Sequence, residues 1–228
     1  MTMPTDKAHD PESRGLRLVP ALLSLTVVSG LIDAVSYLGL GHVFTANMTG
    51  NVVVLGFAAA GAPGFSIPHT LTSLCCFLAG AATGGRIAVR FGSGSRRTWA
   101  RGTFAAEAVL TAACAAVAFA APGATATAYT VIAVTAFAMG LRNATVRRLG
   151  IADLTTTVLT MTLTGLAADS RLGGGAGHNS PRRIGSVFAM LAGALLGAWL
   201  VLHHGLGFPL LIAAIVPAVL AATASGRE

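Results

Sequence analysis

The sequence predicts an all-α membrane protein, with six transmembrane helices and two short polar helices, re-entrant or interfacial, arranged as two inverted three-span halves. Of the 228 residues, 54% are hydrophobic and only 10% are charged, whereas a soluble domain carries about 25% charged residues. Long apolar runs recur along the chain, and the basic residues collect at alternate ends of these runs. Both features are typical of a chain that has the lipid bilayer as its solvent.

Six apolar runs are long enough to cross a hydrocarbon core of about 30 Å. They span residues 18–40, 68–90, 102–121, 126–146, 184–203 and 205–224. The first run is not followed by a small-residue cleavage site, so we expect a retained span rather than a signal peptide.

The polar segment 1–17 precedes these runs and contains Pro4 and Pro11. We expect it to be a disordered cytoplasmic tail. The remainder forms one integral membrane domain, with a first half at 18–121 and a second half at 122–228.

Two further segments, 43–60 and 155–168, are shorter and rich in Thr and Asn. The basic residues decide whether these segments cross. If only the six long runs cross and the N-terminus is inside, all fifteen Lys and Arg are cytoplasmic; if all eight cross, seven lie inside and eight outside. The positive-inside rule favours six spans in a bacterial cytoplasmic (inner) membrane, with a cytoplasmic N-terminus and two segments that enter and leave on one side.

An internal repeat links the two halves. The sequence GLIDA at residues 30–34 recurs as GLRNA at 140–144, and after one inserted residue Met48-Thr49 matches Leu159-Thr160. Three crossings per half are an odd number, so the second half is inverted, as in many transporters and channels with a site near the midplane. A chance match in Ala-, Gly-, Leu- and Thr-rich sequence is the alternative.

Asp33 is the first candidate site residue. It lies well inside the first apolar run, where an ionised carboxylate costs about 2.5–3.5 kcal/mol to insert and therefore faces partners or water. It is either a proton or cation site, or a hydrogen-bonded group that fastens helices together.

Asn47, Thr49 and Asn51 surround Gly50 at the start of the first short segment. Asn and Thr favour helix N-caps. If a half-helix starts here at membrane depth, its N–H groups face a polar or anionic solute. Otherwise the residues cap an external helix at the interface.

The second half contributes Arg142, Asn143, Thr156 and Thr160 as candidates. Arg142 either binds an anionic substrate or pairs with Asp33, or its side chain snorkels to the cytoplasm. We expect about 15 Å between Asp33 and Arg142 along the membrane normal, which argues against a direct pair. The threonines either line a polar path or hydrogen-bond between helices.

Three blocks resemble the YoaK-like family of bacterial membrane proteins: SGLIDA at 29–34, ANMTGN at 46–51 and MGLRN at 139–143. The resemblance extends from about residue 19 to 220 and implies a membrane location and topology, not an activity. The chain departs from the family at Arg142, where Gln is usual, and at Thr160-Met161, where Thr-Gly is usual.

The expected function is a transporter or channel for a small polar solute or ion. The alternatives are a non-transporting scaffold or regulatory membrane protein and, less favoured, a membrane-embedded enzyme. We predict no enzyme activity, metal or cofactor, because catalytic motifs and metal-ligand spacings are lacking. Basic residues at span ends explain the net charge of +7 without nucleic acid. The expected partners are the bilayer and a solute, and a homo-oligomer is compatible with the sequence.

Overall fold

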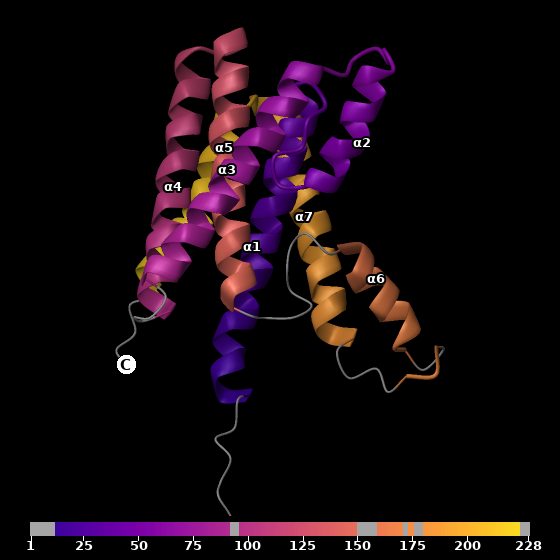
Figure 1. Ribbon diagram of the computed structural model, residues 1–228, viewed down its shortest axis with the longest axis vertical. Coiled ribbons are helices and arrows are strands. Elements are labelled where there is room, and N and C mark those ends of the chain that lie inside the picture. The colour runs from indigo at the N-terminus through magenta and orange to yellow at the C-terminus, as the bar shows by residue number, and fades with distance from the viewer. Residues whose placement is uncertain (1–11, 92–95, 150–158, 171–172, 176–179, 224–228) are drawn as a thin grey trace, which may run out of the picture.

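Eight α-helices make up the described part of the chain in a computed structural model (Figure 1). The structure describes residues 12–91, 96–149, 159–170, 173–175 and 180–223, and these contain no strand. In chain order the helices are α1 (Glu12–Gly39), α2 (Met48–Ala59), α3 (Ile67–Phe91), α4 (Arg96–Ala120), α5 (Thr125–Leu149), α6 (Leu159–Ala168), α7 (Ser180–His204) and α8 (Gly207–Thr223). The all-α prediction is confirmed.

Each apolar run of the sequence corresponds to one long helix, and the two short polar segments contain α2 and α6. Because α1 begins at Glu12, the predicted disordered tail of residues 1–17 is too long at its C-terminal end. Residues 12–17 read ESRGLR, and Glu, Arg and Leu have high helix propensity, which extends the helix beyond its apolar part. Residues 1–11 lie outside the described ranges.

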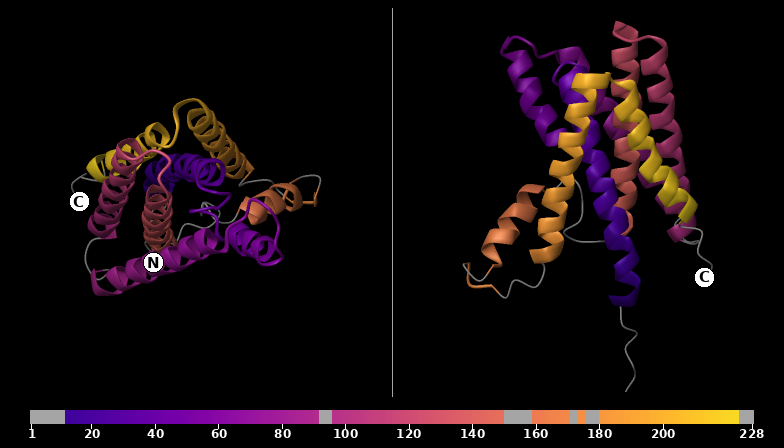
Figure 2. Two further views of the ribbon diagram at one scale, coloured as in Figure 1. Left: turned by 90° about the horizontal axis from the view of Figure 1, so that it is seen from above. Right: turned by 180° about the vertical axis from the view of Figure 1, so that it is seen from behind.

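The six longer helices alternate in direction (Figures 1 and 2). In Figure 1, α1, α4 and α7 rise, whereas α3, α5 and α8 descend. The short helices differ from these. Both α2 and α6 begin near mid-height, and from there α2 runs upward while α6 runs downward.

The longer helices pack in pairs. α3 lies along α5, α1 lies along α7, and α4 lies along both α8 and α5. Buried α5 residues supply much of the core, including Val131, Ile132, Ala136, Ala138 and Met139. The central position of α5 explains why it can be less apolar than the outer helices.

Glycines bring α1 and α7 into backbone contact. A Cβ atom on Gly30 would collide with the carbonyl oxygen of Met190, and one on Gly193 would collide with the carbonyl oxygen of Val27. Small residues allow the two backbones to approach closely, and the resulting van der Waals packing stabilises helix pairs in lipid.

The same arrangement joins α3 to α5. A Cβ atom on Gly140 would collide with the carbonyl oxygen of Phe77, and one on Gly80 would collide with that of Phe137. The α5 residues of this contact lie 110 positions after the α1 residues of the first contact. The α3 residues lie 113 positions before the α7 residues of the first contact. The two helix pairs therefore meet through corresponding residues.

Four helices of the described chain are long and apolar enough to cross a membrane: residues Pro20–Gly39, Ile67–Phe91, Trp99–Ala120 and Pro181–His204. They belong to α1, α3, α4 and α7. The helix α5 has 25 residues but is less apolar, and α8 is apolar but has 17 residues. The structure thus has several helices suited to crossing a bilayer.

We predict that Gly80→Ala destabilises the protein whereas Gly85→Ala does not. The new methyl group at Gly80 meets backbone of α5, while the space around Gly85 on the same helix is open. Overpacking of this kind costs about 1–3 kcal/mol. Thermal unfolding in detergent measures the difference, and equal melting temperatures for the two variants would contradict a tight α3–α5 contact.

Candidate functional site

The Asp33 side chain accepts hydrogen bonds from the backbone at the start of α2. Its Oδ1 atom accepts hydrogen bonds from the Ala46 N–H at 2.9 Å and the Asn47 N–H at 3.3 Å. The side chain is 6% exposed. Asp33 lies six residues before the end of α1, about 9 Å along the helix axis. The chain must therefore fold back along α1 before α2 begins.

A short turn makes this return. Gly41 and His42 both have positive φ, 84° and 59°, a conformation that costs Gly little and is uncommon for other residues. The His42 ring stabilises the turn, because its Nδ1 atom lies 2.9 Å from the Gly64 carbonyl oxygen in the α2–α3 connection.

Asn47 is the N-cap of α2, as its residue type predicts. Its backbone is extended (φ −102°, ψ 91°), and its Oδ1 atom accepts from the Gly50 N–H at 3.4 Å. Asp33 and Asn47 together satisfy N–H groups that a helix leaves open at its start. The two candidates from separate sequence blocks therefore form one local structure.

Asn51 ties the returning segment to α3. Its side chain is fully buried, with Oδ1 accepting from the Phe44 N–H at 2.9 Å and Nδ2 donating to the Phe44 carbonyl at 2.6 Å and to the Ser73 Oγ at 3.0 Å. Ser73 also donates to the Phe44 carbonyl at 2.6 Å. With its amide fully engaged, Asn51 positions the site rather than facing a solute. Ser73 was missed from the sequence, where nothing distinguishes it from other α3 residues.

Thr49 and Thr160 are both exposed, each in the first turn of its short helix. Thr162, one half-turn further along α6, is buried. Thr156 lies outside the described residues. The first turns of α2 and α6 thus each present a threonine hydroxyl at the point where the helix begins.

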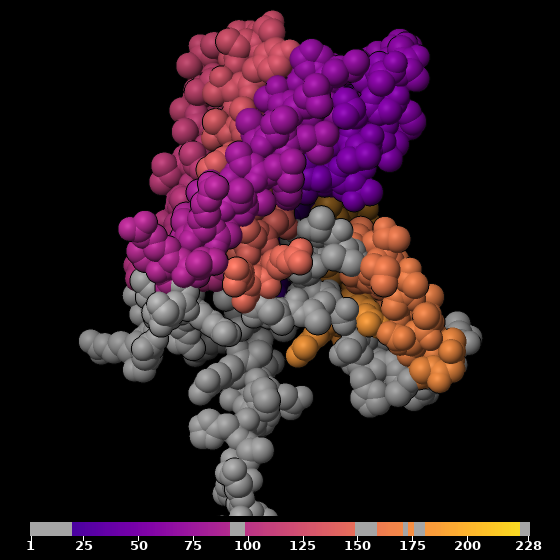
Figure 3. Space-filling model, viewed as in Figure 1, coloured from indigo at the N-terminus to yellow at the C-terminus, as the bar shows by residue number. Residues whose placement is uncertain are grey.

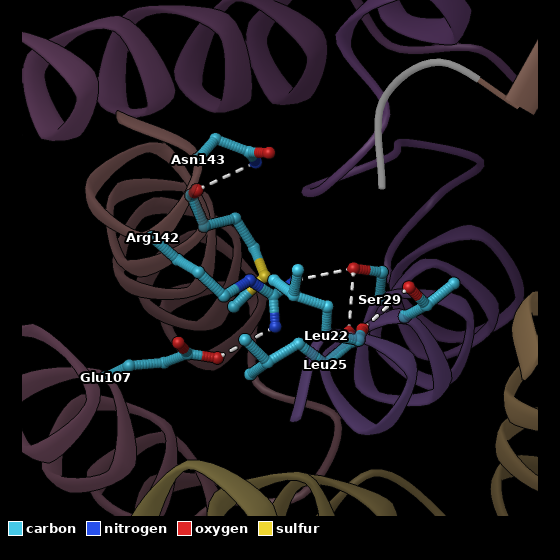
Figure 4. Close-up of polar contacts among 8 residues, drawn as sticks. Leu22, Leu25, Ser29, Glu107, Arg142 and Asn143 are labelled. Carbon is cyan, nitrogen blue, oxygen red and sulfur yellow. Dashed lines mark hydrogen bonds and ion pairs between the residues drawn. The ribbon is translucent and has the colours of Figure 1, made fainter. Parts of the chain in front are cut away.

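Arg142 does not snorkel to the cytoplasm. Its side chain is fully buried, with Nη1 donating to Glu107 Oε1 of α4 at 3.0 Å and Nη2 donating to Ser29 Oγ of α1 at 2.5 Å (Figure 4). A buried guanidinium needs such partners, because an unpaired charge in the membrane interior is costly. Glu107 is fully buried as well, so the pair is shielded from solvent on both sides.

The predicted separation of about 15 Å between Asp33 and Arg142 was too large. The guanidinium contacts Ser29, which is one helical turn from Asp33 on the same face of α1, and four residues correspond to about 6 Å. The distance of a residue from the end of its helix was a poor measure of depth here. α5 continues beyond Arg142, and the long side chain of Arg142 points into the bundle.

Asn143 lies on a different side of α5 from Arg142 (Figure 4). Its Nδ2 atom donates to the Met139 carbonyl at 2.9 Å, and the residue is half-buried. Although Asn143 occupies the position that matches Asp33 in the repeat, the structure does not bring it into the Arg142–Glu107 pair.

Several buried polar atoms in the described residues have no hydrogen-bond partner. They include Glu107 Oε2, Arg142 Nε and the hydroxyl groups of Thr111 and Thr45. Thr111 is one turn from Glu107 on α4, and Thr45 directly precedes the segment that binds Asp33. Buried groups of this kind usually bind water or a ligand. A polar column therefore runs from the start of α2 through Ser29 to Glu107.

Long apolar helices, basic residues near one set of helix ends and a polar centre define the class of this molecule: an α-helical, multi-pass integral membrane protein. Residues 21–223 match the family described as DUF1275, protein of unknown function. The chain belongs to this family.

A curated relative agrees with this assignment. The chain is 34% identical over 152 residues to the UPF0700 transmembrane protein YoaK of Bacillus subtilis (strain 168), a match that covers 65% of this chain and 64% of the relative. No solved structure matches the chain. The YoaK-like resemblance of the three sequence blocks is thereby confirmed.

We predict that Glu107→Gln lowers the stability of the protein by about 3–5 kcal/mol, because it leaves the buried Arg142 charge unpaired. The double variant Glu107→Gln/Arg142→Gln should recover most of this loss. Denaturation in detergent micelles measures both.

Asp169→Asn is the matched control. Its partner is Arg183, at 2.6 Å, but the Asp169 side chain is 60% exposed, so the loss should be about 1 kcal/mol or less. If the double variant is as unstable as Glu107→Gln alone, the unpaired charge of Arg142 is not the cause of the instability.

Proposed function

We propose that this protein is a transporter or channel for a small polar solute or ion, and that the solute binds where α2 and α6 begin. The observation that carries the proposal is that both short helices start near mid-height and run in opposite directions (Figure 1), α2 in the upper and α6 in the lower part of the same side of the molecule (Figure 3). Interrupted helices that point their N-termini at a midplane site are a recurring design of membrane transporters.

An inverted repeat is part of this proposal, and the helix boundaries support it. α2 and α6 begin at Met48 and Leu159, 111 positions apart, and α3 and α7 each have 25 residues, 113 positions apart at both ends. The α1–α7 and α3–α5 glycine contacts use matching residues. The corresponding helices α1 and α5 run in opposite directions, as an inverted second half requires.

Six crossings and a cytoplasmic N-terminus also belong to the proposal. The crossing helices would be the four long apolar ones together with α5 and α8. The arginines near helix ends in the described ranges are Arg14, Arg17, Arg86, Arg90, Arg96, Arg97, Arg101, Arg147, Arg148, Arg182 and Arg183. Their helix ends all lie at the lower side of Figure 1, so the positive-inside rule assigns that side to the cytoplasm of a bacterial inner membrane.

The candidate solute contacts follow from the geometry. Asp33, Asn47 and Thr49 lie at the start of α2, and Thr160 at the start of α6. Of the two α5 candidates, Arg142 stays bound to Glu107 and Asn143 lies on another side of the helix (Figure 4), so neither is part of this set. Threonine and asparagine offer donors and acceptors without charge, which suits a small polar solute.

Reporter fusions after Gly64 and Gly94 test the topology. With six spans, a reporter after Gly64 is external and one after Gly94 is cytoplasmic. Eight spans would reverse both, because α2 would then cross. A Gly94 reporter on the external side would remove the basis for two inverted halves.

Flux into liposomes tests the activity. We expect the purified protein to release or take up one solute from a panel of small ions and polar metabolites. Thr49→Ala should slow that flux several-fold, because it removes a hydroxyl at the start of α2. Thr83→Ala is the matched control, since that hydroxyl donates to the Ala79 carbonyl of its own helix at 2.8 Å.

Equal effects of the two threonine variants would place the solute elsewhere. No flux across a broad panel, with a stoichiometric partner protein that copurifies, would favour the scaffold function instead.

A further inference from the structure

The centre of the bundle has more acidic than basic side chains. The charged residues buried among the described ones are Asp33, Glu107, Arg142 and Arg183. Arg183 lies apart from the others, bound to Asp169 at the end of α6. Asp33 and Glu107 thus share one guanidinium, and with both carboxylates ionised the centre carries one net negative charge.

In the structure the guanidinium binds Glu107, so Asp33 is the carboxylate without a cationic partner in contact. Its compensation comes from the Ala46 and Asn47 N–H groups. The start of a helix supplies about half a positive charge, which is less than one full charge. A buried ion that is not fully compensated in a bilayer is costly.

We propose, on the basis of the transporter function above, that Asp33 binds and releases one proton during the cycle, with Arg142 held on Glu107 as a fixed ion pair. The proton joins the Asp33 carboxylate from water and returns to water, and no other bond forms or breaks. The solute would then move together with a proton.

The surroundings of Asp33 favour a proton over a metal ion. Hard cations require several oxygen ligands, whereas the contacts on Asp33 Oδ1 are N–H donors. The next polar group toward the cytoplasmic side on α1 is Ser29, whose hydroxyl already receives Arg142. A proton needs only one carboxylate oxygen.

Few other titratable groups face Asp33. Tyr37 lies one turn away on α1, and its ring packs against His42 of the turn, with ring centroids 5.1 Å apart. The helices packed on α1 are α7 and α8. α7 carries its charged and His residues only at its two ends, and α8 has none. Arg142 and Glu107 approach from α5 and α4.

Proton binding would also affect α2. An ionised carboxylate accepts stronger hydrogen bonds than a protonated one. Protonation of Asp33 therefore weakens its hold on the Ala46 and Asn47 N–H groups. This gives a direct link between the proton and the position of the half-helix at the proposed solute site.

Infrared spectroscopy of the purified protein in lipid nanodiscs tests the proposal without any solute. A protonated carboxyl in apolar surroundings has its own C=O band. We expect wild-type protein to gain one such band as the pH falls from alkaline to mildly acidic, and Asp33→Asn to lose it entirely. Asp169→Asn, the same change at an exposed carboxylate, should retain the band.

A band that persists in Asp33→Asn, or that sodium abolishes at constant pH, would overturn the proposal. Flux in liposomes with no Asp33 band would retain the transporter and reject the proton.

Wild-type protein provides a second measurement, in case Asp33→Asn does not fold. Dicyclohexylcarbodiimide modifies protonated carboxyl groups in apolar surroundings, and mass spectrometry of the peptides locates the adduct. We expect labelling of Asp33 that increases several-fold at acidic pH. Labelling of Glu107 in place of Asp33 would contradict the assignment.

Discussion

The first turn of an α-helix has backbone N–H groups with no partner inside the helix, and the arrangement around α2 depends on how these groups are satisfied. Asp33 reaches across from α1 to accept two hydrogen bonds just before the helix starts, and Asn47 accepts another from Gly50. Buried backbone outside a regular helix needs partners of this kind for its polar groups. The buried Asp33 carboxylate is therefore a structural requirement of this turn.

Close helix contacts position the helices around the polar side chains of the centre. α1 and α5 contribute to one buried apolar cluster, and each also has a close glycine contact with a further helix, α7 in one case and α3 in the other. Polar side chains then fill the interval between them: Arg142 of α5 reaches Ser29 of α1 and Glu107 of α4. Apolar packing thus positions the helices, and the contacts of Arg142 with Glu107 and Ser29 connect three of them.

Local features of the sequence predicted much of this. The N-cap role of Asn47 and the positions of α2 and α6 follow from residue type and polarity. The Arg142–Glu107 pair and the Asn51–Ser73 bond did not, because their members are 35 and 22 residues apart on different helices. Sequence distance from a helix end also misjudged the depth of Arg142, since it ignores how far a long side chain extends toward the core. The early start of α1 was missed because only its apolar part was counted.

The two short helices are fastened at opposite ends. α2 is held at its first turn by Asp33 and Asn51, whereas Arg183 of α7 grips the last turns of α6, donating to the Gly165 carbonyl at 2.8 Å and to Asp169. The described contacts therefore restrain α2 where it begins and α6 where it ends.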